Sequence, residues 1–221
     1  MLHNFGVLWD MDGVLVDTAE FHFRSWEQTL REMDIPFERR KFQAVFGRNN
    51  YDTLTSLLHR PPEAELLQAI SEQKESLFRK LIHGKAIPLP GVGTWLEHLR
   101  HLGALQAVAS SAPQENIDLL VDELGLHSYF AALCAGHMLP SKPDPALFLL
   151  AASILGLSPR VCIVIEDSLA GVEAAHRAGM KCLAVASTHP VGALGQADLV
   201  LERLDQMGVD EALSRLGVET A

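Results

Sequence analysis

The chain has 221 residues, of which 48% are hydrophobic and 21% charged, so it can form one large domain or two small ones around a sizeable core. Its net charge of −10 argues against a nucleic-acid-binding protein, which would carry a basic stripe, and against adhesion to anionic membranes. The chain begins without a basic leader, and its longest apolar run, 146–157, is shorter than the roughly 20 residues that span a bilayer. We therefore expect a cytoplasmic protein, a monomer, with no nucleic-acid or membrane partner.

The first predicted element is an apolar strand at 5–10, and acidic residues follow it at once. The stretch LWDMDGVLVD, Leu8 to Asp17, holds three carboxylates within eight residues. Like charges this close raise one another's pKa unless a positive charge lies among them. We expect this acidic group either to be solvated or to hold a cation.

Residues 18 to about 83 show no strand pattern but carry apolar residues at helical spacing. The helical patterns lie at 19–33, 38–46, 50–60 and 62–82. Asp17 and Thr18, directly before the first of them, are expected to cap that helix. The segment that follows, HGKAIPLPGVG, has the proline and glycine content of a hinge or linker. The sequence thus predicts a helical cap domain, 17–85, inserted into a core domain made of 1–16 and 86–221.

From about residue 90 onward, short β-rich runs alternate with helical patterns. The β-rich runs are continuously apolar, as expected for strands covered on both faces, and they lie at 104–110, 131–135, 161–167, 181–187 and 197–202. The helical patterns lie at 91–102, 113–124, 144–155, 168–178 and 205–216. Such alternation implies right-handed crossovers and a parallel sheet. We predict an α/β fold: a doubly wound, Rossmann-like parallel-sheet core with a small all-helical cap inserted after the first strand.

Polar residues stand at the ends of several predicted strands, where ligands collect in open parallel sheets. They are Asp10 and Asp12, Ser110 and Ser111, Lys142, and Glu166 with Asp167. Magnesium prefers oxygen ligands and usually binds carboxylates together with substrate phosphate, and Asp10, Glu166 and Asp167 could supply such oxygens. Ser110 could donate to phosphate oxygens, and Lys142 could neutralise charge that the metal does not reach. This set suits phosphate chemistry with a hard cation.

Four stretches of the chain, in order, resemble the four motifs of the haloacid dehalogenase superfamily. They are DMDGVLVDT, VASS, SKPDP and VIEDSLAGVEAA, and they span most of the sequence. The segment DMDGVLVDTAEFHFRSW further resembles the β-phosphoglucomutase-like branch. The resemblance implies that Asp10 attacks phosphorus to form an aspartyl phosphate, and that Asp12 serves as general acid and then as base.

The resemblance also implies which residues share these tasks. The catalytic residues would be Asp10, Asp12, Ser110 and Lys142. The ligands of Mg²⁺ would be Asp10, Asp12 through its backbone carbonyl, Glu166 and Asp167. The substrate-binding residues would be His22, Trp26, Gly47, Arg48, Asn50, Lys74, Ser111 and Asn116.

The cap residues are expected to decide the substrate. His22 and Trp26 lie one helical turn apart; packing within the cap is one interpretation, and contact with the general acid and the substrate cleft is the other. β-Phosphoglucomutases carry an arginine three residues past the cap-loop glycine, where it anchors a second phosphate, but the position counted from Gly47 is Asn50. Arg48 could substitute for that arginine, and Lys74 could match another phosphate-facing cation.

We predict a magnesium-dependent phosphoryl-transfer enzyme that hydrolyses small phosphorylated metabolites such as sugar phosphates. A β-phosphoglucomutase-type activity is the closest alternative, and Asn50 argues against it. A dehalogenase of this superfamily would lack the second aspartate, Asp12. A non-catalytic ligand-binding module on the same fold is a further alternative, although it would be expected to have lost a site group and none is missing.

Overall fold

A six-stranded parallel sheet forms the centre of the molecule in the computed structural model, which describes residues 5–218. The strands are β1 (Gly6–Trp9), β2 (Leu105–Ser110), β3 (Ala132–Ala135), β4 (Cys162–Glu166), β5 (Lys181–Val185) and β6 (Leu199–Leu201). Each strand falls within a predicted run, so the predicted parallel α/β fold is confirmed. The strand order is β3-β2-β1-β4-β5-β6, and the direction of winding therefore reverses at β1, beside β4.

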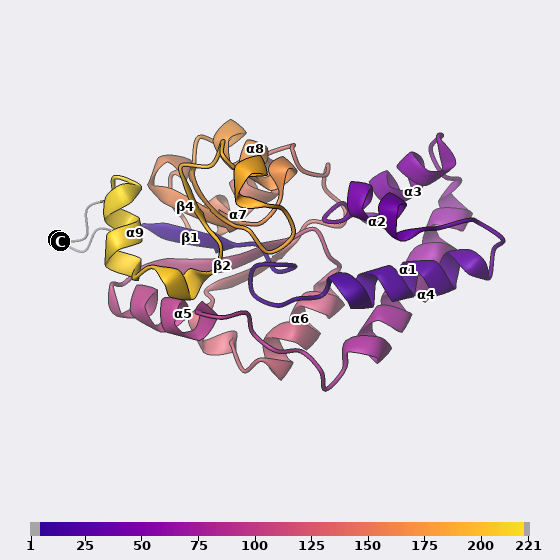
Figure 1. Ribbon diagram of the computed structural model, residues 1–221, viewed down its shortest axis with the longest axis horizontal. Helices are drawn as coiled ribbons and strands as arrows, with labels where there is room; N and C mark the ends of the chain where they lie inside the picture. Colours follow the sequence, from indigo (N-terminus) through magenta and orange to yellow (C-terminus); the bar gives the residue numbers. More distant parts are fainter. Residues whose placement is uncertain (1–4, 219–221) are drawn as a thin grey trace.

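Helices cover both faces of the sheet (Figure 1). The first face carries α5 (Val92–His101), α6 (Gln114–Glu123) and α9 (Val209–Arg215), and the second carries α7 (Ala146–Ile154) and α8 (Leu169–Arg177). Successive strand residues point to opposite faces, so Val7 and Trp9 join the first apolar layer and Leu8 joins the second. These strands are apolar throughout because both of their faces are buried.

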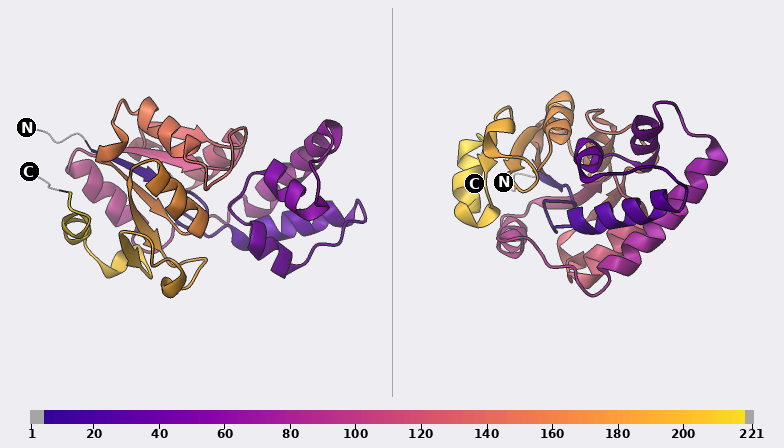
Figure 2. Two further views of the ribbon diagram at one scale, coloured as in Figure 1. Left: turned by 90° about the horizontal axis from the view of Figure 1, so that it is seen from above. Right: turned by 45° about the vertical axis from the view of Figure 1, so that its right-hand side comes forward.

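The first four helices after β1 form a separate lobe, which we call the cap. They are α1 (Ala19–Arg31), α2 (Arg39–Val45), α3 (Asn50–Leu58) and α4 (Ala64–Ile82). Figure 2 shows the cap beyond the carboxyl ends of the strands, at the far end of the molecule from α9. Its apolar side chains form their own cluster of Phe23, Trp26, Leu30, Phe42, Leu54 and Ile70.

Helix α4 links the two lobes, because Phe78 and Ile82 in its last turns pack into the core of the sheet domain. The two connecting segments run side by side: Val16 pairs with Pro88 in an antiparallel bridge, and Leu89 N–H donates to the Leu15 carbonyl at 2.9 Å. This double connection lies where the sequence suggested a hinge. The predicted domain limits stay a prediction, and their outermost residues, 1–4 and 219–221, lie outside the described residues.

Across residues 5–218, none of the helices combines the length and apolar character required to cross a membrane.

Candidate active site

The acidic residues after β1 and β4 meet at the point where the strand order reverses. Strands β1 and β4 are neighbours, and Asp10 N–H donates to the Ile165 carbonyl at 3.0 Å, which brings the end of β1 against the end of β4. Asp10, Glu166 and Asp167 are all buried, and one carboxylate oxygen from each lies within 4.8 Å of the others. Ligands of open parallel sheets gather at this topological position. The structure thus brings together the three carboxylates that the sequence suggested.

Lys142 reaches this carboxylate cluster from the loop that follows β3. Its Nζ donates to Asp10 Oδ1 at 2.9 Å and also to Glu166 Oε1. Burial opposes a charged lysine, but the two carboxylates outweigh it and hold the pKa of Lys142 above its ordinary value. Glu166 Oε2 accepts the backbone N–H groups of Asp167 and Ser168, each at 2.7 Å. Glu166 is therefore engaged on both oxygens, and its contacts fix the position of Lys142.

The cluster carries more negative charge than Lys142 can balance. Burial raises the pKa of Asp10 to about 7, with Glu166 and Asp12 adding to the rise and Lys142 opposing it. Burial likewise raises the pKa of Asp167, with Glu166 and Asp10 adding to the rise. A divalent cation among these oxygens would relieve this repulsion, and a set made of carboxylate oxygens is the donor chemistry that hard cations prefer. The residues present therefore fit a hard divalent metal ion.

Two glycines make room for the carboxylates. A Cβ on Gly171 in α8 would lie 1.9 Å from the Glu166 side chain, so only glycine lets the helix approach this closely. A Cβ on Gly13 would lie 2.0 Å from Asp167 Oδ2, and its φ of +81° also favours glycine. Ser168 is the N-cap of α8, and its Oγ accepts Gly171 N–H at 3.0 Å.

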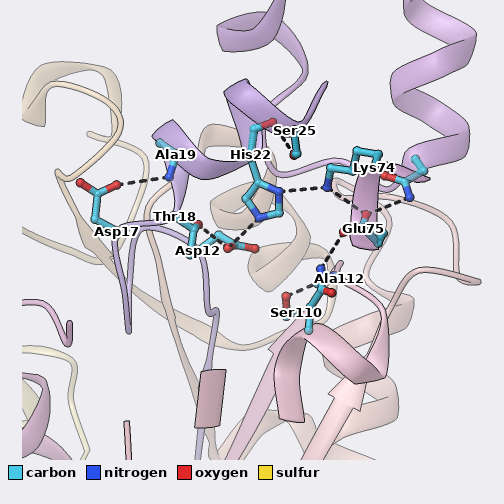
Figure 3. Close-up of polar contacts among 12 residues, drawn as sticks. Asp12, Asp17, Thr18, Ala19, His22, Ser25, Lys74, Glu75, Ser110 and Ala112 are labelled. Carbon is cyan, nitrogen blue, oxygen red and sulfur yellow. Dashed lines mark hydrogen bonds and ion pairs between the residues drawn. The ribbon is translucent and has the colours of Figure 1, made fainter. Parts of the chain in front are cut away.

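Asp12 points toward Thr18 and His22 at the start of the cap (Figure 3). Its Oδ1 accepts the Thr18 hydroxyl and lies 3.2 Å from His22 Nε2. Lys74 Nζ lies 2.9 Å from His22 Nδ1. An ammonium can only donate, so Nδ1 accepts and Nε2 carries the hydrogen that points toward Asp12. Burial opposes the charged form of Asp12, but His22, Thr18 and Lys74 together lower its pKa.

Thr18 differs from its expected role. The sequence suggested that Asp17 and Thr18 cap the first cap helix, and Asp17 Oδ1 does accept Ala19 N–H, at 3.3 Å. Thr18 occupies the N-cap position of α1 but makes no side-chain capping hydrogen bond. The expectation was wrong for Thr18, because its fully buried hydroxyl is turned toward Asp12 instead.

Glu75 organises the cap side of the site, although it is not among the residues predicted from the sequence. Its Oε1 accepts from Lys74 Nζ and from Asn50 Nδ2, each at 2.9 Å, and its Oε2 accepts from Asn116 Nδ2 at 2.7 Å. Arg79 completes the group by donating to Asn116 Oδ1 at 2.8 Å. This network joins α3 and α4 of the cap to α6 of the core. Asn116 therefore contacts the site only through Glu75.

A small cavity of about 40 Å³ lies between cap and core, where these groups meet. The predicted site residues that line it are Asp10, Asp12, His22, Trp26, Gly47, Arg48, Asn50, Lys74 and Ser111. Trp26 also belongs to the apolar cluster of the cap, so both interpretations of this residue hold at once. Ser110 is fully buried, and its Oγ accepts Ala112 N–H at 3.2 Å, which shapes the turn that carries Ser111.

Two further residues support the site and were missed in the sequence. Asn49 is the N-cap of α3: its Oδ1 accepts Asp52 N–H at 2.9 Å, and its Nδ2 donates to the Leu139 carbonyl of the core at 2.9 Å. Its position directly before a helical pattern was a usable signal, since asparagine is a favoured N-cap. Thr188 donates to Asp167 Oδ2 at 2.6 Å from the loop after β5. Nothing in the sequence marks that contact.

Comparison with known proteins agrees with this arrangement. The sequence profile described as haloacid dehalogenase-like hydrolase matches residues 7–185. The chain is 34% identical to the β-phosphoglucomutase of Bacillus subtilis (strain 168), over 92% of each chain. It is 31% identical to the chloroplastic 5-amino-6-(5-phospho-D-ribitylamino)uracil phosphatase of Arabidopsis thaliana, over 92% of this chain but only 56% of that protein's length.

A solved structure shows the same fold. The crystal structure of β-phosphoglucomutase from Clostridium difficile superposes with a TM-score of 0.88, covers 97% of both chains and is 23% identical in sequence. At this identity the match supports the fold alone. The cap and the sheet domain therefore have the architecture that the sequence motifs suggested.

Proposed function

The chain belongs to the haloacid dehalogenase-like hydrolase family, and on that premise we propose that it is a magnesium-dependent phosphatase of small phosphorylated metabolites, working through an aspartyl phosphate. The observation that carries this proposal is the separation of two neighbouring aspartates by their partners. Lys142 holds Asp10 within the carboxylate cluster, whereas Thr18 and His22 hold Asp12 on the cap side. Two carboxylates with different surroundings can perform two different tasks.

Asp10 acts as the nucleophile. Its carboxylate oxygen attacks the phosphorus of a phosphate monoester, and the bond between phosphorus and the ester oxygen breaks as the aspartyl phosphate forms. Lys142 orients Asp10 through Oδ1 and balances part of the charge that gathers on the phosphoryl oxygens. Ser111 and the backbone of the turn that Ser110 shapes line the cavity beside this centre.

Asp12 moves the proton. In its protonated form it gives the proton to the departing ester oxygen, and its carboxylate then takes a proton from the water that attacks the aspartyl phosphate. His22 and Thr18 favour the carboxylate form in the absence of substrate. The charge of an arriving phosphate ester raises the pKa of Asp12 and favours the acid form that the first step needs.

Asp10, Glu166, Asp167 and the backbone carbonyl of Asp12 would hold Mg²⁺, with Lys142 beside them. When bound, the ion would stabilise negative charge on the phosphoryl oxygens and on the attacking carboxylate. The clustering of buried carboxylates supports this assignment. Thr188 holds Asp167 in place by donating to its Oδ2, and Gly13 leaves room for the same oxygen.

We favour hydrolysis over transfer to a second hydroxyl because of the cap. A phosphomutase must anchor a second phosphate, and a bidentate arginine is the best side chain for that purpose. Asn50 stands at the corresponding place, and the carboxylate it contacts, Glu75, would repel a phosphate. Lys74 does not offset this, because it is already shared between Glu75 and His22. A β-phosphoglucomutase-type activity is the second candidate, and Arg48, exposed beside the cavity, is the observation in its favour.

One experiment separates the two candidates. The enzyme is incubated with Mg²⁺, β-glucose 1-phosphate and a trace of the 1,6-bisphosphate, and the products are followed by phosphate release and by glucose 6-phosphate formation. Release of free phosphate supports the phosphatase. Accumulation of glucose 6-phosphate would refute the phosphatase and support the mutase. Absence of metal-dependent turnover with this and with chromogenic phosphate esters would favour a binding module.

The cytoplasmic location, the monomeric state and the absence of a nucleic-acid partner stay predictions. The partner that the proposal requires is a small phosphorylated substrate.

A further inference from the structure

The small cavity opens beside a much larger cleft between cap and core. This cleft has a volume of about 1070 Å³, against about 40 Å³ for the cavity. Both are lined by Asn49, Asn50, Glu75, Pro113 and His137, so the two spaces adjoin. The cavity has room for only a few water molecules, and most of a leaving group must therefore lie beyond it. The cleft is the space that adjoins it on the side of Glu75.

The cleft has an apolar lining that a sugar phosphate does not need. Tyr51 on α3 of the cap is 44% exposed, and Met138 in the loop after β3 of the core is 83% exposed. Leu67 and Leu139 line the same cleft between them. Large exposed apolar side chains that line one cleft from two lobes are typical of a ligand site. A tyrosine face and a methionine sulfur are both suited to contact with a flat aromatic ring.

The charges of the cleft restrict what such a ring can carry. Four acidic residues line the cleft, namely Asp52, Glu72, Glu75 and Glu115. Arg79 is the only arginine or lysine among its lining residues, and it already donates to Asn116. An anionic group in the cleft would therefore meet like charges, and an uncharged ring would not.

We propose that the cleft binds an uncharged, flat heterocyclic ring at the far end of the leaving group, so that the substrate is a phosphate monoester in which a short polyhydroxylated chain connects the phosphate to the ring. This inference rests on the proposed phosphatase function. The phosphate lies at Asp10, the hydroxyl groups contact the polar residues Asn50 and Glu75, and the ring lies between Tyr51 and Met138. A sugar phosphate without a flat heterocyclic ring would leave the cleft empty.

Flavin mononucleotide is a suitable probe, because it joins one phosphate to a ribityl chain and an uncharged flat ring. Binding is measured with Asp10→Asn protein and Mg²⁺, by quenching of flavin fluorescence, and D-ribitol 5-phosphate serves as the ringless competitor. We expect flavin mononucleotide to bind at least ten times more tightly than ribitol 5-phosphate. Equal affinities, or no binding of the flavin, would overturn the proposal.

Substitutions then locate the ring. In the same background, Tyr51→Ala and Met138→Asp should each weaken flavin binding at least fivefold and leave ribitol 5-phosphate within twofold, as measured by calorimetry. Ile154→Asp, an exposed apolar residue on α7 outside the cleft, is the matched control and should change neither ligand. Flavin binding that ignores both cleft substitutions would contradict the assignment.

Phosphate release by the unmodified enzyme is measured separately, so that the two proposals can fail independently. Ring-dependent binding without any phosphate release would refute the phosphatase and keep the cleft assignment. Phosphate release from ribitol 5-phosphate, together with equal binding of the two ligands, would keep the phosphatase and refute the cleft assignment.

Discussion

The two ends of the site are built in different ways. At the core end, Asp10 follows β1, Glu166 is the last residue of the neighbouring β4, and backbone N–H groups hold Glu166 in place. At the cap end, Asn50, Lys74 and Glu75 project from helices, and side chains alone hold them together. Strand ends in one sheet are fixed by the backbone register, whereas contacts between helix faces depend on the individual side chains. The comparison suggests that the core determines the chemistry and the cap selects the substrate.

The most severe test of the core end is Asp10→Asn. The amide cannot act as the nucleophile, so kcat should fall by at least about 10⁴-fold, the scale seen when a nucleophile is removed. Turnover of a chromogenic phosphate ester with Mg²⁺ measures it. Asp144→Asn is the matched control, because Asp144 accepts Ala146 N–H at 2.9 Å and an asparagine oxygen can do the same. A variant at Asp10 that keeps a tenth of the activity would refute its role.

Gly171→Ala tests whether the core end depends on close packing. The added methyl group would overlap the Glu166 side chain, which must move and take Lys142 with it. We expect activity to fall about 100-fold, as for small misplacements of catalytic groups, and stability to fall by about 1–3 kcal/mol. Phosphate release and urea unfolding measure the two effects.

Gly93→Ala provides the control for that packing test. Gly93 also lies in a helix, but a Cβ there would meet nothing within 4 Å. It should leave activity unchanged and raise stability by about 0.4–1 kcal/mol. Equal losses in both glycine variants would contradict contact with Glu166 as the cause, because Gly93 has no neighbour that a Cβ would meet.

The cap end is tested by introducing an arginine at position 50, where β-phosphoglucomutases carry one. Asn50→Arg alone should change little, because the new arginine would pair with Glu75. Combined with Glu75→Gln, it should raise the ratio of kcat/KM for a sugar bisphosphate to that for the monophosphate about tenfold, since the freed guanidinium can bind the second phosphate. Steady-state kinetics of the two single variants and the double variant measure the coupling. A purely additive result would contradict the contact between these residues.

The smallest expected effect concerns acid stability. Burial opposes the charge on Glu75, but the charge of Lys74, together with the hydrogen bonds from Lys74 and Asn116, lowers its pKa below the ordinary 4.5. A lowered pKa in the folded state contributes stability that is present above pH 4.5 and is lost as the pH falls through the folded value. Glu75→Gln should therefore lower Tm by about 3 °C at pH 7, and the deficit should shrink toward pH 3.

Thermal unfolding across that pH range measures the Glu75 effect, and Glu72→Gln is its control. Glu72 is exposed on the same helix and accepts from Gln68, so its substitution should have no pH-dependent effect. A deficit at Glu75 that grows as the pH falls would contradict the sign of the shift.

The fold and the core end could be predicted because their signals are local in the sequence. Continuous apolar runs mark the strands, and Asp10 and Glu166 stand directly at the strand ends where a parallel sheet collects its ligands. The network around Glu75 has no such local signal. Its partners Asn50 and Asn116 lie 25 and 41 residues away, and only the packing of α4 against α3 and α6 brings them together.

Two residues show how a correct local signal can mislead. Thr18 stands where a helix cap belongs, but burial and the nearness of Asp12 give its hydroxyl a different partner. Gly171 stands inside a helical pattern, where glycine permits close packing of strand and helix, and the structure shows that the group it accommodates is Glu166 itself. Local sequence preference placed both residues on the correct element, but only the tertiary contacts show that they position Asp12 and Glu166.

The central claim is that Asp10 carries the phosphoryl group during turnover. Rapid quenching of the enzyme with excess phosphate ester, followed by borohydride reduction and peptide mass spectrometry, tests it directly, because reduction converts an aspartyl phosphate into homoserine. We predict homoserine at position 10 in the presence of substrate, and none when substrate is omitted. Turnover with aspartate unchanged at position 10, or homoserine at another aspartate, would contradict this account.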